Sequence, residues 1–320
     1  MGDTPRVAVV GDVAWDLYLR LDRDSVFGEK LTVQESLRDV GGTGANAAAA
    51  AAKLGSETAL FGSVGDDAIA DTLVSKLSAR GVHTAGVANV PGQSMIAVIL
   101  ITPHGRQVLV DRRVADRLDH VTPARVVAAG DVIYLSCVPI ETAESVISDA
   151  RPDQQVVLAV EGWQLQRSTV EMWGRLTEGA AAVVLNDAAA QQFLGSRRRL
   201  SDVLRCPGIV TRAASGILIV DRDGHETAVP ATRVAVVDAT GAGDCLSGAL
   251  CHFLARGRAL EEAASLANIA AGLSTTALGA QSALPTEDAV VTIAPTSGTD
   301  GPPLPIRVAD IEEGTNHGSA

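Results

Sequence analysis

Short, continuous apolar runs alternate with helical patterns along most of this chain, and no other sequence feature constrains its fold as strongly. The runs are typical of strands buried on both faces, and they lie at 7–11, 58–62, 131–136, 156–160, 181–186 and 208–211. Helical patterns lie between them or follow them, at 44–54, 67–80, 141–150, 168–177, 187–194, 242–256 and 259–277. This order predicts an α/β fold: a doubly wound, mostly parallel sheet with helices on both faces.

Two stretches interrupt the alternation. Residues 94–113 form two β-rich runs around Pro103-His104-Gly105, which is a hairpin signal, and residues 13–40 look extended and partly polar. We expect these segments, about 13–40 and 94–115, to meet as a small β-sheet lid on a single domain spanning 1–293. Residues 294–320 are rich in Pro and Gly, which predicts a disordered tail.

Composition excludes several classes of function. The net charge of −12 leaves no basic footprint for nucleic acid or anionic membranes. No apolar run approaches the ~18 residues of a membrane span, and the N-terminus has no apolar signal core. We therefore expect a soluble, cytoplasmic protein. The cysteines fit no zinc pattern and are expected to be small buried hydrophobes: Cys137, Cys206, Cys245 and Cys251.

A glycine-rich turn opens the helical pattern of the last third, in the sequence DATGAGDCLSGAL at 238–250. Successive amides of Gly241 to Asp244 can converge at a helix N-terminus, where they favour a transferring phosphoryl group. A carboxylate is repelled by such an anion unless it has a chemical role, and Asp244 is placed to act as a general base. From this motif alone, Asp244 is equally well interpreted as a helix cap. The Walker A pattern is absent.

A second glycine-rich turn, GGTGANAAAAAAKLG at 41–55, opens a helix made almost entirely of Ala. Exposed amides at its start suit an anion or a hydroxyl, and Asn46 offers both a donor and an acceptor. Gly42, Gly44 and Ala47 also match the dinucleotide pattern GxGxxA. That pattern should directly follow the first strand, which here ends at Gly11, about 30 residues earlier, so we disfavour it. A purely structural turn remains a further interpretation.

Together, in this order and about 200 residues apart, GGTGAN and DATGAGD resemble the two signatures of the PfkB carbohydrate kinase family, also called the ribokinase family. The resemblance covers roughly residues 5–290. It implies a ribokinase-like fold with a β-sheet lid, ATP and Mg²⁺ as cofactors, and phosphorylation of a hydroxyl, expected to be a primary alcohol, on a small sugar or sugar derivative. Because lid sheets in this family often pair between subunits, it also implies a homodimer through the lid.

The resemblance assigns roles to individual positions. Asp244 is the implied catalytic base, and the implied anion hole is formed by Gly241, Ala242 and Gly243. The implied substrate contacts are Asp12, Asp16, Gly42, Thr43 and Asn46. The implied ATP contacts are Asn186, Thr211, Gly216 and Asn268, together with Gly241 and Gly243. Asp238, Thr240 and Gly279 resemble parts of a loop that often binds K⁺ in this family.

Three sugar-side positions depart from the ribokinase pattern. Ala14 stands where ribokinases have Asn, Thr43 where they have Lys, and Cys137 where they have Glu. The sugar is therefore not expected to bind in the manner of ribose.

Two departures concern the nucleotide. Ala189 replaces the Glu of an NxxE motif that helps to order Mg²⁺, with Asp187 as a potential substitute. Ala213 replaces a Gly of the TxGxxG loop on the ATP side.

Two alternative functions remain open. A nucleoside kinase of the same family needs a flat apolar slot, for which Trp15 is a candidate if it does not simply pack in the lid. A catalytically weakened binding or regulatory protein on the kinase fold is suggested by Ala189. Anionic substrates require Arg112 or Arg113 to point inward; otherwise these are solvated lid charges.

Overall fold

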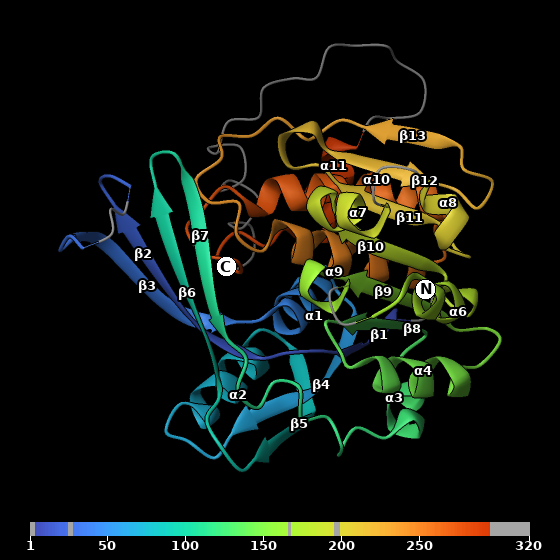
Figure 1. Ribbon diagram of the computed structural model, residues 1–320, viewed down its shortest axis with the longest axis horizontal. Helices are drawn as coiled ribbons and strands as arrows, with labels where there is room; N and C mark the ends of the chain where they lie inside the picture. The colour runs from blue at the N-terminus through green and yellow to red at the C-terminus, as the bar shows by residue number, and fades with distance from the viewer. Residues whose placement is uncertain (1–3, 25–27, 166–167, 195–198, 295–320) are drawn as a thin grey trace, which may run out of the picture.

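The computed structural model describes residues 4–24, 28–165, 168–194 and 199–294. Within them, a nine-stranded sheet is covered by helices on both faces (Figure 1). In sheet order its strands are β13 (Glu226–Val229), β12 (Ile217–Val220), β11 (Gly208–Thr211), β10 (Ala182–Asn186), β9 (Gln155–Val160), β8 (Val132–Ser136), β1 (Arg6–Val10), β4 (Glu57–Gly65) and β5 (Val82–Val90). All pairings from β11 to β5 are parallel, whereas β12 and β13 pair antiparallel. The doubly wound, mostly parallel sheet is therefore confirmed.

Side chains of β1 alternate between two apolar cores, as the two-residue period of a strand requires. Val7 and Val9 face one core, and Ala8 and Val10 face the other. The first core is covered by α1 (Thr43–Lys53), α2 (Ala70–Ala79), α9 (Ala242–Ala255), α10 (Leu260–Ser274) and α11 (Glu287–Ile293). The second is covered by α3 (Pro123–Ala129), α4 (Ile140–Asp149), α6 (Val170–Glu178), α7 (Asp187–Leu194) and α8 (Leu200–Val203), with α5 (Gly162–Leu165) beside α7.

Small residues bring α1 and α9 into close contact. A side chain at Gly248 of α9 would collide with the backbone carbonyl of Ala47 in α1. At the start of α1, a Cβ atom on Gly44 would lie 2.7 Å from the Cα atom of Gly11. The two helices, which follow the two glycine-rich turns, are therefore held side by side at the end of β1. This packing places the two motifs together in space.

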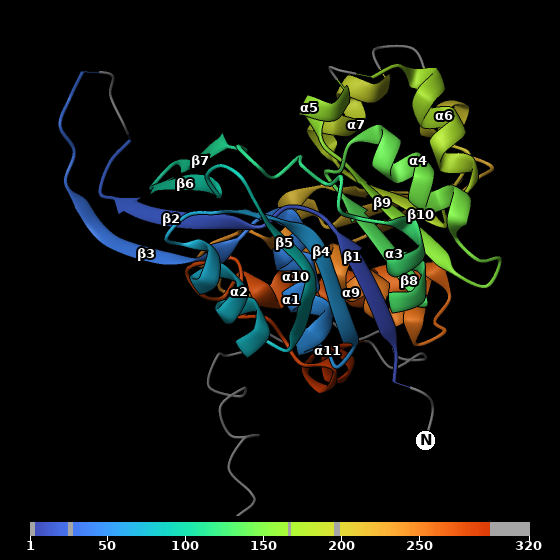
Figure 2. The ribbon, with the colours of Figure 1, turned by 90° about the horizontal axis from the view of Figure 1, so that it is seen from below.

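The expected lid is a separate four-stranded sheet within the described residues. Its strand order is β3 (Val33–Gly41), β2 (Ala14–Leu21), β6 (Met95–Thr102) and β7 (Gly105–Asp111). Figure 2 shows this sheet extending to one side of the main sheet. The β6–β7 hairpin turns at 103–104, as the sequence predicts, and β2 joins the two halves of the lid by pairing with both β3 and β6.

Several elements were not predicted by the alternation; they are β5, the β12–β13 hairpin, α3, α5, α8 and α11. The four cysteines are buried and free, as expected. No helix in the described part of the chain combines the length and the apolar character needed to cross a membrane. The predicted tail lies outside the described residues, apart from Ala294.

Candidate active site

A cavity opens where the carboxyl ends of the central strands meet the two glycine-rich turns. Ligands of open α/β sheets bind at this edge. The residues that line the cavity are Thr43, Tyr134, Ser136, Cys137, Ala159, Val160, Glu161, Val184, Leu185, Asn186, Thr211, Gly243, Asp244 and Ser247. The cavity thus brings together predicted residues of the sugar side, the ATP side and the catalytic turn.

The turn before α9 exposes backbone amides to this cavity. Gly241 caps the helix with a φ of 76°, and a side chain there would collide with Ala280, so the position requires glycine. The amide of Ala242, expected in the anion hole, instead donates to the carbonyl of Ala239 at 3.3 Å. The hydrogen bonds of the described residues use neither the amide of Gly243 nor that of Asp244. These two amides at the start of a 14-residue helix are the natural anion donors.

The carboxylate of Asp244 projects from the same turn. Its Oδ2 atom accepts a hydrogen bond from Nδ2 of Asn46 in α1 at 2.8 Å, rather than capping its own helix. Burial raises the pKa of Asp244 to about 8, the Asn46 hydrogen bond opposes this, and the carboxylates of Glu161 and Asp12 reinforce it. Asp244 is partly buried, and an acid with a pKa near neutrality has the property that a general base needs.

Asp16 of β2 is the second perturbed acid. Its side chain is 3% exposed, and Oδ2 accepts a hydrogen bond from the Tyr18 hydroxyl at 2.9 Å, while Oδ1 has no hydrogen-bond partner. Burial raises the pKa of Asp16 to about 7. Gly41 is needed beside it, because a side chain there would collide with the Asp16 carboxylate. A buried acceptor without a partner is the kind of group that a substrate hydroxyl satisfies.

Asp12, expected to contact substrate, is occupied by protein groups. Its Oδ1 atom accepts hydrogen bonds from the Thr43 hydroxyl at 2.9 Å and from the Gly44 amide at 3.0 Å. Its Oδ2 atom lies 3.2 Å from Nη1 of Arg112. Asp12 therefore ties the end of β1 to the first glycine-rich turn, where Gly42 adopts a φ of 96°.

The two lid arginines point in different directions. Arg112 turns inward, where it pairs with Asp12 and with Asp116 and reaches the carbonyl of Cys137 at 3.4 Å. Arg113 instead pairs with Asp111 at 2.6 Å. Arg113 and Cys137 have φ values of 47° and 55°, so strained backbone flanks the Arg112 contact on both sides.

Two polar groups of the cavity lining were missed by sequence analysis. Ser136, at the end of β8, donates to the Thr43 hydroxyl at 2.8 Å, beside the unusual Cys137. Glu161 follows β9, and burial raises its pKa, with Asp12 adding to the effect and Arg112 opposing it. The signal for both was available: each polar side chain stands at the carboxyl end of a buried strand.

The predicted ATP-side residues lie at the ends of β10 and β11, in the turn before β12 and on α10. Asn186 and Thr211 are register partners at the ends of their strands. Asn186 Oδ1 accepts from the Ala189 amide at 2.7 Å and so begins α7. Gly216 has a φ of 87°, where a side chain would collide with the backbone of Val229. Asn268 donates to the Pro230 carbonyl at 2.7 Å, so it holds the segment that follows β13.

The two positions that depart from the family's nucleotide-side motifs, Ala189 and Ala213, lie in different surroundings. Ala189 is buried in the second core, so this position points away from the cavity. Asp187 is exposed at the start of α7, where it accepts a hydrogen bond from Gln191 and lies 3.8 Å from Arg212. Ala213 keeps a φ of 47°, the left-handed conformation that favours glycine.

The three residues of the expected cation loop lie together. Asp238 Oδ1 accepts from the amide of Thr240 at 2.9 Å and from its hydroxyl at 2.6 Å. Asp238 Oδ2 accepts from the amide of Gly279 at 2.9 Å. The carboxylate of Asp238 is therefore the centre of the loop.

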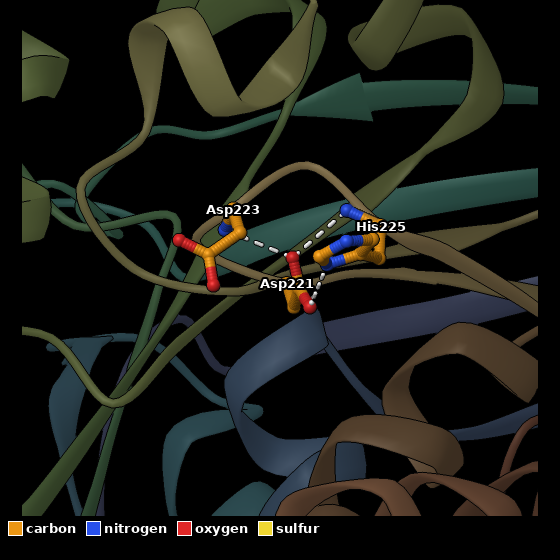
Figure 3. Close-up of side chains that lie close together, drawn as sticks. All are labelled: Asp221, Asp223 and His225. Carbon is orange, nitrogen blue, oxygen red and sulfur yellow. Dashed lines mark hydrogen bonds and ion pairs between the residues drawn. The ribbon is translucent and has the colours of Figure 1, made fainter.

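A different group of potential metal ligands lies on the β12–β13 turn and consists of Asp221, Asp223 and His225 (Figure 3). The Asp221 carboxylate accepts from the amides of Asp223 and His225 at 2.9 and 2.8 Å and from the His225 ring at 2.9 Å. These bonds form the hairpin turn. The turn also lies at the opposite end of β12 from Thr211, because Thr211 pairs with Ile217 and Gly208 with Val220.

Comparison with known proteins identifies the class of enzyme, a phosphotransferase, and its family. Residues 4–287 match the profile described as pfkB family carbohydrate kinase. Ribokinase of Bacillus subtilis (strain 168) is 28% identical over 295 residues, which cover 89% of this chain and 97% of that protein. The chain belongs to the pfkB family of carbohydrate kinases.

Solved structures share the fold. Ribokinase of Arabidopsis thaliana complexed with ribose and ATP superposes with a TM-score of 0.75 at 22% identity, over 91% of this chain and 98% of that one. A nucleoside kinase of Burkholderia thailandensis in complex with inosine gives a TM-score of 0.77 at 20% identity, over 89% and 95% of the two chains. The ribokinase-like fold with its lid is therefore confirmed.

Proposed function

We propose that this kinase transfers the γ-phosphoryl group of ATP to a primary hydroxyl of a small, uncharged sugar, with Asp244 as general base. One observation carries the proposal: the partly buried Asp244 carboxylate stands beside the amides of Gly243 and Asp244 at a helix N-terminus, and loss of water around it raises its pKa to about 8. A base and an anion site in one turn suit in-line attack of a hydroxyl on a phosphoryl group.

In this mechanism Asp244 accepts the proton of the attacking hydroxyl, while the Gly243 and Asp244 amides donate to the phosphoryl oxygens as charge develops. A Cβ atom on Gly243 would meet nothing within 4 Å, so this side of the turn has room for a phosphoryl group. Asn46 keeps the carboxylate oriented from α1. The unpartnered Oδ1 of Asp16 accepts from a second sugar hydroxyl and so orients the substrate.

Asn186 and Glu161 are the side chains that would hold Mg²⁺, which would neutralise charge on the nucleotide phosphates when bound. Val160 pairs with Leu185, so the next residues, Glu161 and Asn186, follow side by side on adjacent parallel strands. Both line the cavity. An amide oxygen and a carboxylate are suitable ligands for Mg²⁺. Glu161 thereby supplies the carboxylate that the buried Ala189 lacks.

Charge in the cavity favours an uncharged sugar over an anionic one. Arg112 points inward, as an anionic substrate requires, but Asp12 and Asp116 already neutralise it. The acids that line or approach the cavity are Asp12, Asp16, Glu161 and Asp244. A phosphate or carboxylate on the sugar would therefore meet net repulsion.

The geometry gives the nucleoside alternative less support. Trp15 and Asp16 are consecutive residues of β2, so their side chains point to opposite faces of the lid sheet. Trp15 packs against the first core. It is therefore not placed to stack on a base whose ribose is held by Asp16.

A homodimer through the lid is part of the proposal. β7 is an edge strand whose residues are all exposed, with Val108, Leu109 and Val110 exposed by 46%, 51% and 50%. An exposed apolar edge strand is suited to pairing with another copy. Sedimentation velocity should give a dimer for the wild type and a monomer for Val108→Lys/Val110→Lys.

The test of substrate class is mass-spectrometric detection of phosphorylated product with Mg·ATP and K⁺ across uncharged sugars, sugar acids, sugar phosphates and nucleosides. We expect product from an uncharged sugar. Product from a sugar phosphate or a sugar acid alone would contradict the charge argument. ATP binding without any product would favour the binding or regulatory alternative.

A further inference from the structure

Gln281 is a buried amide linked to the proposed base through one intermediate side chain. Its Nε2 atom donates to the backbone carbonyl of Val40 at 3.0 Å and to Oδ1 of Asn46 at 2.7 Å. Asn46 in turn donates from Nδ2 to Asp244 Oδ2 at 2.8 Å. Gln281 and Asn46 are only 7% and 5% exposed, so water does not readily replace these contacts.

The direction of these hydrogen bonds is fixed at Val40. A backbone carbonyl can only accept, so the side-chain nitrogen of Gln281 must face it. The same nitrogen contacts Asn46, which must therefore present its oxygen to Gln281. The Asn46 nitrogen is then left to face Asp244. Without Gln281, the Asn46 amide can turn its oxygen toward the carboxylate, where it would repel the ionised form.

The neighbours of Gln281 contact the rest of the site. The amide of Gly279 donates to Asp238 Oδ2 at 2.9 Å. The amide of Ala280 donates to the Tyr18 hydroxyl at 3.1 Å, and Tyr18 donates to Asp16 at 2.9 Å. Three consecutive residues are thus linked to three parts of the site. Gly279 binds Asp238 of the expected cation loop, Ala280 is linked to Asp16 through Tyr18, and Gln281 is linked to Asp244 through Asn46. The backbone at 279–281 is thereby anchored, which gives the Gln281 side chain a defined starting position.

We propose that Gln281 is a positioning residue: it holds the Asn46 amide with its nitrogen toward Asp244 and so stabilises the ionised base. This inference rests on the proposed function, because it assigns Asp244 as the base. Gln281 itself makes no hydrogen bond to Asp244 among the described residues, and it is not one of the residues that line the cavity.

The expected consequence is a change in pH dependence. The Asn46 hydrogen bond lowers the pKa of Asp244 against the effect of burial, so its loss raises that pKa further. Because kcat/KM follows ionisation of the free enzyme, its acidic limb moves to higher pH. The other ionisable groups that interact with Asp244 stay unchanged in a Gln281 variant; they are Asp12, Asp16, Tyr134, Glu161 and Cys245.

The experiment measures kcat/KM for the best sugar from pH 5.5 to 9.5 in wild type and Gln281→Met, which removes the donor but keeps the length of the side chain. We expect the acidic limb to move up by about one pH unit, which is a loss of about tenfold below the limb and little loss on the alkaline plateau. Gln281→Glu has the shape of the native residue and replaces the donor nitrogen, so it should shift the limb in the same direction.

Two comparisons separate positioning from stability. Gln154 also donates from a side-chain amide to backbone carbonyls, those of Val127 and Gly130, at the other end of the sheet. Gln154→Met should leave the pH profile unchanged. In an Asn46→Ala background, Gln281→Met should have no further effect on the limb, since the two residues act in series.

Three results for Gln281→Met would overturn the inference. Its pH profile could equal that of the wild type, its kcat/KM could fall equally at every pH, or its acidic limb could shift even in the Asn46→Ala background. Asp244→Asn, measured in parallel, tests the proposed function separately. If that variant keeps its activity, the base assignment fails. If it is inactive and Gln281→Met leaves the limb in place, only the role of Gln281 fails.

Discussion

Asp244→Asn should stabilise the folded protein while it removes turnover. The Asp244 carboxyl has a pKa of about 8 in the fold, against 3.8 for an aspartate in water, a difference of about four pH units. About three of these units apply at pH 7, and each corresponds to about 1.4 kcal/mol, so keeping this group in the fold costs at most about 4 kcal/mol. The carboxylate is only partly buried, and the water that reaches it reduces this cost. Asparagine has nearly the same shape, can accept the Asn46 hydrogen bond, and carries no charge to desolvate.

The sign of the effect follows from the raised pKa. Below about pH 4 both the folded and the unfolded states hold the proton, so wild type and variant differ little. Between about pH 4 and pH 8 only the unfolded state ionises, so the wild type loses stability relative to the variant by about 1.4 kcal/mol per pH unit. Above about pH 8 both states are ionised and the difference stays constant.

The assay is urea unfolding followed by circular dichroism at pH 5, 6, 7 and 8. The difference in unfolding free energy between Asp244→Asn and wild type should grow at each step. Asp149→Asn, an exposed acid on α4, is the matched control and should show no such growth. A variant that is less stable than the wild type, or a difference that does not change with pH, would refute the argument that Asp244 is held against its preference for water.

Three further predictions concern other parts of the chain. Ala213→Gly should stabilise the protein by about 1 kcal/mol in urea unfolding, because it relieves a non-glycine residue at a φ of 47°; no gain would contradict that strain. Gly248→Ala should cost about 3 kcal/mol in the same assay, because its Cβ meets the Ala47 carbonyl; a neutral result would mean that α1 and α9 separate easily. Glu161→Gln should raise the half-saturating Mg²⁺ concentration about tenfold in steady-state kinetics, and an unchanged value would remove Glu161 from the metal site.

The main sheet could be predicted because its inner strands are buried on both faces and therefore read as continuous apolar runs. Strand β5, VHTAGVANV, lies at the sheet edge and has only two buried residues, so no such run marks it. The β12–β13 hairpin consists of two four-residue strands, and β13 is mostly exposed. Edge position and short length remove the signal in both cases.

The catalytic turn could also be predicted, because glycine and acid patterns at helix starts report local backbone geometry. The direction in which side chains of the lid and the loops point could not be predicted from the sequence. Arg112 and Arg113 are adjacent and chemically identical, yet only the first turns inward. Gln281 follows α10 in a segment without periodicity, and its contact with Asn46 depends on packing between residues 235 positions apart.

The Ala189 departure has a structural explanation that the motif did not provide. Because α7 begins directly at Asp187, position 189 faces the second core, where Ala189 packs with Phe193 and its neighbours. A carboxylate at this point of the present fold would be buried among apolar side chains. A carboxylate of the cavity lining stands instead at the end of the neighbouring strand, at Glu161.

The most direct test of the account is ADP release by wild type and Asp244→Asn with Mg·ATP, K⁺ and the best sugar of the panel, with ATP affinity measured by calorimetry on both proteins. We predict turnover by the wild type, a loss of several orders of magnitude in the variant, and ATP affinity within a few-fold for the two. Turnover in Asp244→Asn close to that of the wild type would contradict the assignment of Asp244 as the catalytic base.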